Sequence, residues 1–260
     1  MLSERQTQIL ELAKRSGKVV VEDLAGQFQV SLQTIRKDLN GLCDARLLAR
    51  IHGGAILSSG VENVDYDARR AIAAQEKAII GRAVADLIPD NASLFINIGT
   101  TTEAVAQALL RKSGLMVITN NINVASLMRP YPNVEIVIAG GVVRRADGGI
   151  VGEAAVDFIR QFKVDYAVIG VSAIDADGSL LDYDYREVRV AQAIMSNARH
   201  VILAADGSKF DRTAPVRIGH LSQVHSFVTD RAPAAIRAVC ARHELALIET
   251  GGDGSDDGEA

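Results

Sequence analysis

Four consecutive residues, Gly99, Thr100, Thr101 and Thr102, have the types and the position expected of an anion-binding loop. They follow an apolar run and precede a helical pattern. A glycine lets the backbone approach a ligand, and hydroxyl and free N–H groups at a helix start attract negative charge, so phosphate is the natural ligand. The same residues also fit a threonine-rich helix cap that needs no ligand. The segment is not a P-loop, because no Gly-Lys-Ser or Gly-Lys-Thr follows it.

Further polar residues follow other apolar runs in the same half of the chain, and they are Asn120, Asn121, Gly140, Gly141 and Lys209. If those runs are parallel strands, the loops after them meet at one rim of the sheet, where open α/β sheets bind ligands. Lys209 would supply a point charge for a phosphate, although a lone lysine is more often a surface residue. The combination predicts a site for a small, polar, anionic ligand.

A different set of polar side chains lies on a predicted helix from Leu32 to Asp44, which Ser31 is placed to cap. We expect Leu32, Ile35 and Leu39 to face the core. The outward residues are then Gln33, Thr34, Arg36 and Lys37. Side chains of these types read base edges and hold phosphates, so the helix is suited to a major groove.

Arg36 and Lys37 also fit a solvated helix face that binds nothing. A predicted hairpin follows, however, and it supplies Arg50 and His52 as a wing against the sugar-phosphate backbone. The hairpin favours DNA binding over the plain solvated face.

The elements that carry these residues fall into two regions. Residues 1–57 show three helical patterns and then two short apolar runs, joined by glycines that suit a tight turn. The helical patterns are Ser3–Arg15, Val21–Phe28 and Leu32–Asp44, and the apolar runs are Leu47–Ile51 and Ala55–Leu57. This order predicts a winged helix-turn-helix, and we expect the mixed polar segment 58–75 to be a linker.

Residues 76–249 alternate β-branched runs with helical patterns. We expect strands at Leu94–Ile98, Met116–Thr119, Val134–Ile138, Ala167–Val171, Val201–Ala204, Ser226–Thr229 and Leu245–Ile248, and helices at Glu103–Arg111, Val124–Met128, Ala154–Phe162, Glu187–Asn197 and Pro233–Arg242. Such alternation predicts an α/β fold with a mostly parallel sheet covered by helices. The Gly-, Ser- and Asp-rich segment 250–260 is expected to be a disordered acidic tail.

Composition excludes several classes of protein. Of the 260 residues, 48% are hydrophobic and 23% are charged, as in folded globular proteins. No apolar stretch approaches the roughly 20 residues of a membrane-spanning helix, and the N-terminus lacks the apolar core of a signal peptide, so we expect a cytoplasmic protein. The formal net charge is −4, but residues 1–57 carry eight Lys or Arg against six Asp or Glu, which gives +2 there.

We expect no metal and no cofactor. Cys43 and Cys240 lie in unrelated patterns and are interpreted as ordinary buried thiols. His220 and His225 are not spaced to bind a metal from one helix face. The segment 175–179 resembles a calcium loop but lacks the required glycine and glutamate, so it is interpreted as a turn.

Two of these stretches resemble the signature of the DeoR family of bacterial transcriptional repressors. They are Thr34–Leu39 and Leu48–Ala55. The resemblance implies double-stranded operator DNA as a partner. It also implies a homo-oligomer, a tetramer by the family's pattern, since operators of helix-turn-helix proteins are usually near-palindromic. Arg46 departs from the family, which usually has glycine or asparagine there.

The second region is similar to the sugar-phosphate sensor domain of that family, which in turn resembles ribose-5-phosphate isomerase. The resemblance matches 206–209 with the isomerase's Asp-x-Ser-Lys element and Glu187 with its helix-borne glutamate. Ile169 and Ser172 stand where the isomerase has carboxylates, so we expect binding without catalysis and no catalytic residue. Four further stretches, at 94–101, 117–124, 146–154 and 174–181, resemble one member of the repressor family in particular. This resemblance implies sn-glycerol 3-phosphate or a similar phosphorylated metabolite as the ligand.

The sequence therefore predicts a repressor of carbohydrate catabolism that a phosphorylated three-carbon ligand shifts away from its operator. Three alternatives stay open: an isomerase-like enzyme with an added helical domain, a DeoR-type regulator of another sugar-phosphate pathway, or a DNA-binding protein whose α/β half only oligomerises. Arg144 and Arg145 would either neutralise a phosphate or pair with acids of a neighbouring subunit.

Overall fold

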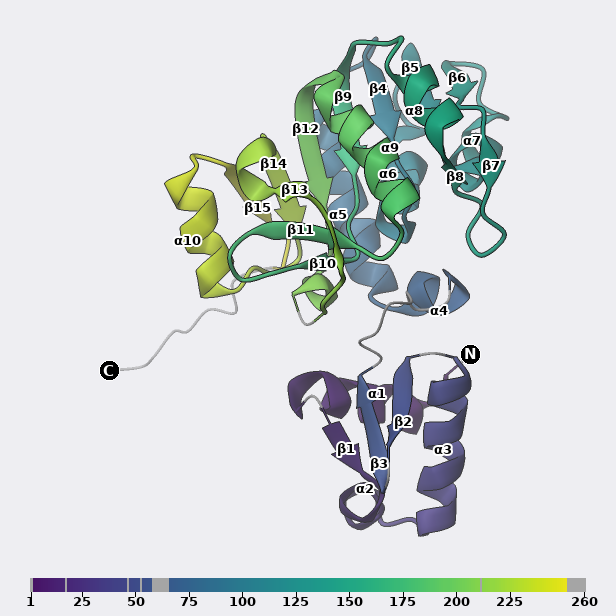
Figure 1. The fold of residues 1–260 in the computed structure, drawn as a ribbon, viewed down its shortest axis with the longest axis vertical. Helices are drawn as coiled ribbons and strands as arrows, with labels where there is room; N and C mark the ends of the chain where they lie inside the picture. Colours follow the sequence, from purple (N-terminus) through teal and green to yellow (C-terminus); the bar gives the residue numbers. More distant parts are fainter. Residues whose placement is uncertain are drawn as a thin grey trace. The chain divides into compact units, whose positions relative to one another are not determined.

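The protein is described from a computed structural model, which covers residues 2–16, 18–45, 47–51, 53–57, 66–210 and 212–251. The chain divides into two compact units, residues 1–72 and residues 73–260. Figure 1 shows the ribbon of each unit.

The first unit is a winged helix-turn-helix, as predicted. Its elements are α1 (Glu4–Ser16), β1 (Lys18–Val20), α2 (Val21–Phe28), α3 (Leu32–Asp44), β2 (Leu48–Ile51), β3 (Gly54–Leu57) and α4 (Tyr66–Ala71). The helices α2 and α3 have the predicted bounds. The three strands form an antiparallel sheet in the order β1-β3-β2, and β1 was not predicted.

Glycine at the hairpin allows the third strand to approach the first. A Cβ added at Gly54 would lie 2.1 Å from the Val19 carbonyl oxygen, and Gly53 has a φ of +74° that favours glycine. The hairpin glycines thus serve both the turn and the packing of the added strand β1.

The core of this unit is formed mainly by Ile9, Ala13, Ile35, Leu39 and Leu42, all without exposed surface. The prediction that Leu32 also faces the core is wrong, because 42% of its surface is exposed. Leu32 is the first residue of α3, where the helix has no preceding turn to pack it against the core. Cys43 is half-buried rather than buried.

The second unit is an α/β fold around one parallel sheet of seven strands (Figure 1), in the order β15-β14-β12-β9-β4-β5-β6. The strands are β4 (Ser93–Ile96), β5 (Leu115–Thr119), β6 (Val134–Ile138), β9 (Val164–Ile169), β12 (Ala198–Ala204), β14 (Ser226–Thr229) and β15 (Ala246–Glu249). The helices are α5 (Ala74–Leu87), α6 (Thr100–Leu109), α7 (Ile122–Met128), α8 (Glu153–Ile159), α9 (Tyr185–Ser196) and α10 (Ala234–Arg242), with short 3-10 helices η1 (Gly207–Lys209) and η2 (Leu221–Gln223).

Helices cover both faces of this sheet. One apolar cluster packs side chains of α5, α6 and α7, such as Ile80, Val105 and Val124, against one face. A second cluster packs side chains of α8, α9 and α10, such as Val156 and Val188, against the other. This three-layer arrangement leaves the loops at the strand ends to form a site.

All seven predicted strands and all five predicted helices of this region exist, with ends that shift by up to three residues. Short antiparallel pieces were not predicted: β7 (Val142–Val143) pairs with β8 (Ile150–Val151), and β10 (Ala173–Ile174), β11 (Ser179–Asp182) and β13 (Val216–His220) form a small sheet. The interpretation of 175–179 as a turn is confirmed, since it joins β10 to β11.

The boundaries of the linker and the tail stay predictions. Residues 58–65 and 252–260 lie outside the described residues, while α4 lies within the predicted linker and α5 begins at Ala74. Among the described helices, none has the length and apolar character that crossing a membrane requires.

Candidate functional site

The site is defined by the point at which the chain order of the sheet reverses, between β4 and β9. From β4 the chain moves to β5 and β6 on one side, and later strands are added beyond β9 on the other. All pairings in this sheet are parallel, so the carboxyl ends of the strands share one edge. Ligands of open α/β sheets bind in the crevice at such a reversal.

Gly170, directly after β9, brings two predicted site segments together. A Cβ added there would lie 3.4 Å from Thr102 Cγ2 in the first turn of α6 and 3.9 Å from the Ala204 carbonyl oxygen at the end of β12. The start of α6 and the segment that leads to Lys209 therefore meet beside this glycine.

The start of α6 has the features of an anion site. Gly99, with a φ of +153°, precedes the helix and has no side chain to cap it. The first N–H groups of a helix have no partner within the helix, and their dipoles favour negative charge. Thr100 lies half-buried at the rim, whereas Thr101 and Thr102 are buried. The Thr102 hydroxyl lies 2.8 Å from both the Asn97 and the Gly99 carbonyl oxygens and donates to them, so this hydroxyl is engaged by the protein backbone.

Lys209 is buried on η1, with only 8% of its surface exposed, beside the fully buried Asp206. Burial by itself raises the pKa of a carboxyl, but the charges of Lys209 and Lys77 lower the pKa of Asp206 below its ordinary value. Asp206 is therefore ionised and holds positive charge at the end of β12. Lys77, on α5, was not identified from the sequence.

The two predicted asparagines differ in what their side chains do. Asn121 caps α7 by accepting from the Asn123 backbone N–H at 2.9 Å, and it donates to Glu103 Oε1 at 3.1 Å. Asn120 donates to the Ile150 carbonyl oxygen at 3.0 Å, but its buried Oδ1 has no hydrogen-bond partner among the described residues. Asn121 thus holds α7 and Glu103 in place, whereas Asn120 has a buried acceptor that no described residue satisfies.

Gly140 and Gly141 lie apart from Lys209. They follow the edge strand β6, which β5, β4 and β9 separate from β12, and both are exposed. A Cβ at Gly141 would lie 3.0 Å from the Val151 carbonyl oxygen. Gly141 therefore accommodates the β7–β8 pair, and the structure does not bring these two glycines to the anion site.

Glu187 belongs to an ionic cluster rather than to a set of free ligands. Arg144 donates to Glu187 Oε2 at 2.5 Å, to Asp147 at 2.7 and 2.8 Å, and to Asp184 at 3.2 Å. Arg144 is thus paired with acids of its own chain. Arg145, next to it, is exposed.

A further buried carboxyl, Asp182 on β11, accepts from the Ser172 hydroxyl at 2.9 Å. Burial raises the pKa of Asp182. Burial also raises the pKa of Glu187 to about 8, and the neighbouring Asp182 and Asp147 carboxyls add to the rise, while Arg144 opposes it. Neither Asp182 nor the role of Arg144 could be deduced from the sequence, because the cluster joins α9, β11 and the turn after β7.

The helix α3 presents outward most of the side chains that the sequence places on its polar face. Gln33, Arg36 and Lys37 are exposed and Thr34 is half-buried. Ser31 caps the helix by accepting from the Thr34 backbone N–H at 3.2 Å. These residues therefore form one outward face.

The inner side of α3 is attached to α1 by an ion pair. Arg5 donates to Asp38 Oδ2 at 2.5 Å, and Gln6 donates to the Asp38 carbonyl oxygen at 3.4 Å. This fixes the rotation of α3 about its axis and hence the direction of its polar face.

Of the predicted wing residues, Arg50 lies on β2, and His52 lies outside the described residues, as does Arg46. His220 and His225 have structural roles: His220 accepts from the Ser222 backbone N–H and His225 from that of Val201, each at 3.0 Å.

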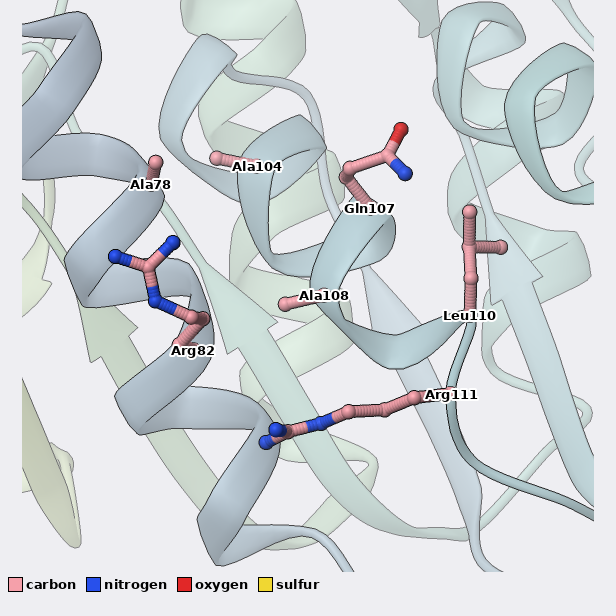
Figure 2. Close-up of a pocket in the computed structure, with 7 residues that line it drawn as sticks. All are labelled: Ala78, Arg82, Ala104, Gln107, Ala108, Leu110 and Arg111. Carbon is pink, nitrogen blue, oxygen red and sulfur yellow. The ribbon is translucent and has the colours of Figure 1, made fainter.

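A groove of about 500 Å³ lies on the second unit between α5 and α6 (Figure 2), lined by Ala78, Arg82, Ala104, Gln107, Ala108, Leu110 and Arg111. Besides Ala78 and Arg82 of α5, its lining comes from the middle of α6 and the two residues after that helix, and not from the first turn that carries residues 100–102. The groove is therefore separate from that site.

A winged helix-turn-helix joined to an α/β unit with anion-binding features at its strand reversal defines a ligand-responsive DNA-binding regulator. The chain belongs to the DeoR family: residues 5–60 match the DeoR-like helix-turn-helix domain, and residues 72–231 match the DeoR C terminal sensor domain.

Curated relatives match almost the whole chain. The glycerol-3-phosphate regulon repressor of Escherichia coli (strain K12) is 47% identical over 94% of this chain and 98% of its own length. The protein of the same name from Haemophilus influenzae is 50% identical over 90% and 91%. The HTH-type transcriptional repressor CsqR of Escherichia coli is 40% identical over 89% and 88%. The chain is thus a DNA-binding transcriptional repressor and not an enzyme, which confirms the prediction.

Solved structures match only part of the chain, at low identity. Ribose 5-phosphate isomerase A from Neisseria gonorrhoeae has a TM-score of 0.39 at 14% identity, over 52% of this chain and 53% of its own. The eIF2B beta subunit from Chaetomium thermophilum has a TM-score of 0.43 at 16% identity, over 59% and 48%.

Proposed function

We propose that this repressor controls genes of glycerol 3-phosphate metabolism and that sn-glycerol 3-phosphate, or a closely similar phosphorylated metabolite, releases it from its operator. The relatives named for the glycerol-3-phosphate regulon, at 47% and 50% identity over at least 90% of the chain, support this assignment. A repressor acts where the chromosome is, which supports a cytoplasmic location.

The observation that supports the effector proposal is the meeting of the α6 start with the end of β12, the strand that leads to the buried Lys209. Gly170 lies beside both Thr102 and the end of β12, and Lys209 is only 8% exposed. The positive charge of Lys209 and the N–H groups at the start of a helix both attract anions. We infer that a phosphate is held by the N–H groups of 100–102 together with Lys209.

Operator binding is assigned to α3 and the wing. Arg36 and Gln33 are suited to base edges, and Lys37 and Thr34 to phosphates. Ser31, Arg50 and His52 complete the set of contacts. A homo-oligomer is proposed because two copies of α3 are needed to read two half-sites of a near-palindromic operator.

Coupling between the two sites requires that the effector bind one arrangement of the protein more tightly than the other. We therefore propose that the arrangement competent for DNA has the lower affinity for the phosphorylated ligand. By reciprocity, operator DNA lowers the affinity for the ligand by the same factor.

The test is a gel shift of the full chain on operator DNA, titrated separately with sn-glycerol 3-phosphate, fructose 1-phosphate and deoxyribose 5-phosphate. Release at the lowest concentration by sn-glycerol 3-phosphate is expected. Release by one of the other two at a lower concentration would assign the repressor to another sugar-phosphate pathway. No release by any of the three would refute the anion site as an effector site.

A further inference from the structure

Lys77 is a buried lysine that the effector site proposed above does not yet include. It lies on the first turn of α5, and only 3% of its surface is exposed. Lysines are almost never fully buried unless a negative group compensates them. The charge of Lys77 acts on Asp206, as does that of Lys209, so two ammonium groups from different elements converge on one carboxylate.

The packing of α5 on α6 places Lys77 at the level of the anion site. The two helices run parallel to each other, since Gly81 approaches Ala104 and, further along both, Asp86 pairs with Arg111. They approach closely at Gly81, where an added Cβ would lie 2.6 Å from the Ala104 carbonyl oxygen. One helical turn nearer the two N-termini, this register places Lys77 at the same level along the helix axes as Thr100.

Asp206 gives an independent indication that a ligand completes this region. It has no exposed surface. Its Oδ1 accepts from the Ser208 backbone N–H at 3.1 Å and from the Ser208 hydroxyl. Its Oδ2 is buried without a hydrogen-bond partner among the described residues. A buried acceptor of this kind calls for a donor, and a ligand hydroxyl is one.

We propose that Lys77 is a second ammonium ligand of the effector phosphate, acting with Lys209 and the first turn of α6. Asp206 holds the two ammonium groups in place before the ligand arrives and accepts a hydroxyl of the ligand afterwards. The site therefore takes a phosphomonoester that also carries a hydroxyl group, and it favours the dianion over the monoanion. This inference rests on the effector site proposed above, and it adds a residue from an element outside that site.

The test is calorimetric titration of the full chain with sn-glycerol 3-phosphate, comparing Lys77→Met with Lys163→Met. Lys163 is a matched control, since it is an exposed lysine that precedes β9, at the opposite edge of the sheet. We expect Lys77→Met to weaken binding at least tenfold and Lys163→Met to change it less than twofold.

A pH series separates a charge contact from a structural role. The second pKa of a phosphomonoester is about 6, so the ligand changes from dianion to monoanion between pH 7.5 and pH 5.5. Wild-type affinity is expected to fall over that range, and the fall is expected to be smaller in Lys77→Met. A merely structural role for Lys77 predicts the same fall in both proteins.

Labelling of the wild-type chain provides a readout that does not depend on folding of the variant. The chain has seven lysines. With ¹³C-labelled lysine, the Cε signals of Lys77 and Lys209 should shift on adding sn-glycerol 3-phosphate, while that of Lys163 should not. Wild-type binding with no shift at Lys77, or with unchanged affinity in Lys77→Met, overturns this inference. A wild-type chain that binds no phosphomonoester overturns the proposed effector site itself.

Discussion

The buried Glu187 carboxyl should make the sensor unit less stable as the pH rises. Its pKa is raised from the ordinary value of 4.5 to about 8, first by burial and then by the nearby Asp182 and Asp147 carboxyls. Because the folded chain holds this proton more tightly than the unfolded chain, unfolding becomes easier between about pH 4.5 and pH 8. At about 1.4 kcal/mol per pH unit the full effect is about 5 kcal/mol, of which about 3–4 kcal/mol falls between pH 5 and pH 8.

Glu187→Gln removes the titrating group and keeps an oxygen that accepts from Arg144. We compare the free energy of unfolding of the variant with that of wild type at each pH. This difference should be about 3–4 kcal/mol more favourable to the variant at pH 8 than at pH 5. The comparison with wild type is needed because burial lowers the pKa of His200, which titrates over part of the same range with the opposite sign.

The assay is urea unfolding of both proteins at pH 5 and pH 8, followed by near-ultraviolet circular dichroism of tyrosine. The chain has no tryptophan, and four of its five tyrosines lie after residue 73, so this signal reports mainly on the sensor unit. If the difference in the free energy of unfolding between variant and wild type is the same at both pH values, within about 1 kcal/mol, the reasoning about Glu187 is refuted.

Three further substitutions test the other elements. Arg36→Ala should weaken operator binding by about 1–3 kcal/mol in a gel shift if Arg36 contacts a base, and unchanged affinity would remove it from the interface. Lys209→Ala should raise the concentration of sn-glycerol 3-phosphate that half-releases the operator, and normal induction would place Lys209 outside the pocket. Ser31→Ala should destabilise the first unit by about 0.5–2 kcal/mol in thermal unfolding followed at 222 nm, because the cap of α3 is lost; an unchanged transition would contradict the role of that cap.

Local sequence patterns were enough to predict the helices and strands whose apolar residues recur at regular spacing. The bounds of α3 follow from the periodicity of Ile35, Leu39 and Leu42 and from the Ser31 cap. The strands β6 and β14 have the predicted bounds because their β-branched residues contrast with polar neighbours. The prediction that Leu32 is buried was wrong because periodicity specifies the direction of a side chain around the helix axis. It does not specify whether the first turn of the helix packs against anything.

Long-range pairing explains what the sequence did not predict. The strand β1 has three residues and exists through its pairing with β3, about 35 residues later. The Arg144 cluster joins residues about 40 positions apart. Lys77 belongs to no motif that the sequence analysis singled out. Its position along α6 follows only from the close approach of Gly81 to that helix. Side chains such as that of Asn121, which look like free ligands in the sequence, proved to be helix caps.

The helix α5 is the first element of the second unit, and it packs closely on α6. Gly81 lets the backbones of α5 and α6 come into contact, so the two helices form one closely packed pair. The residue before α5 has a left-handed backbone, and from there the chain leads back toward the DNA-reading unit. Because the first unit ends at Ile72, the N-terminus of α5 lies next in the chain to the point where the two units are joined.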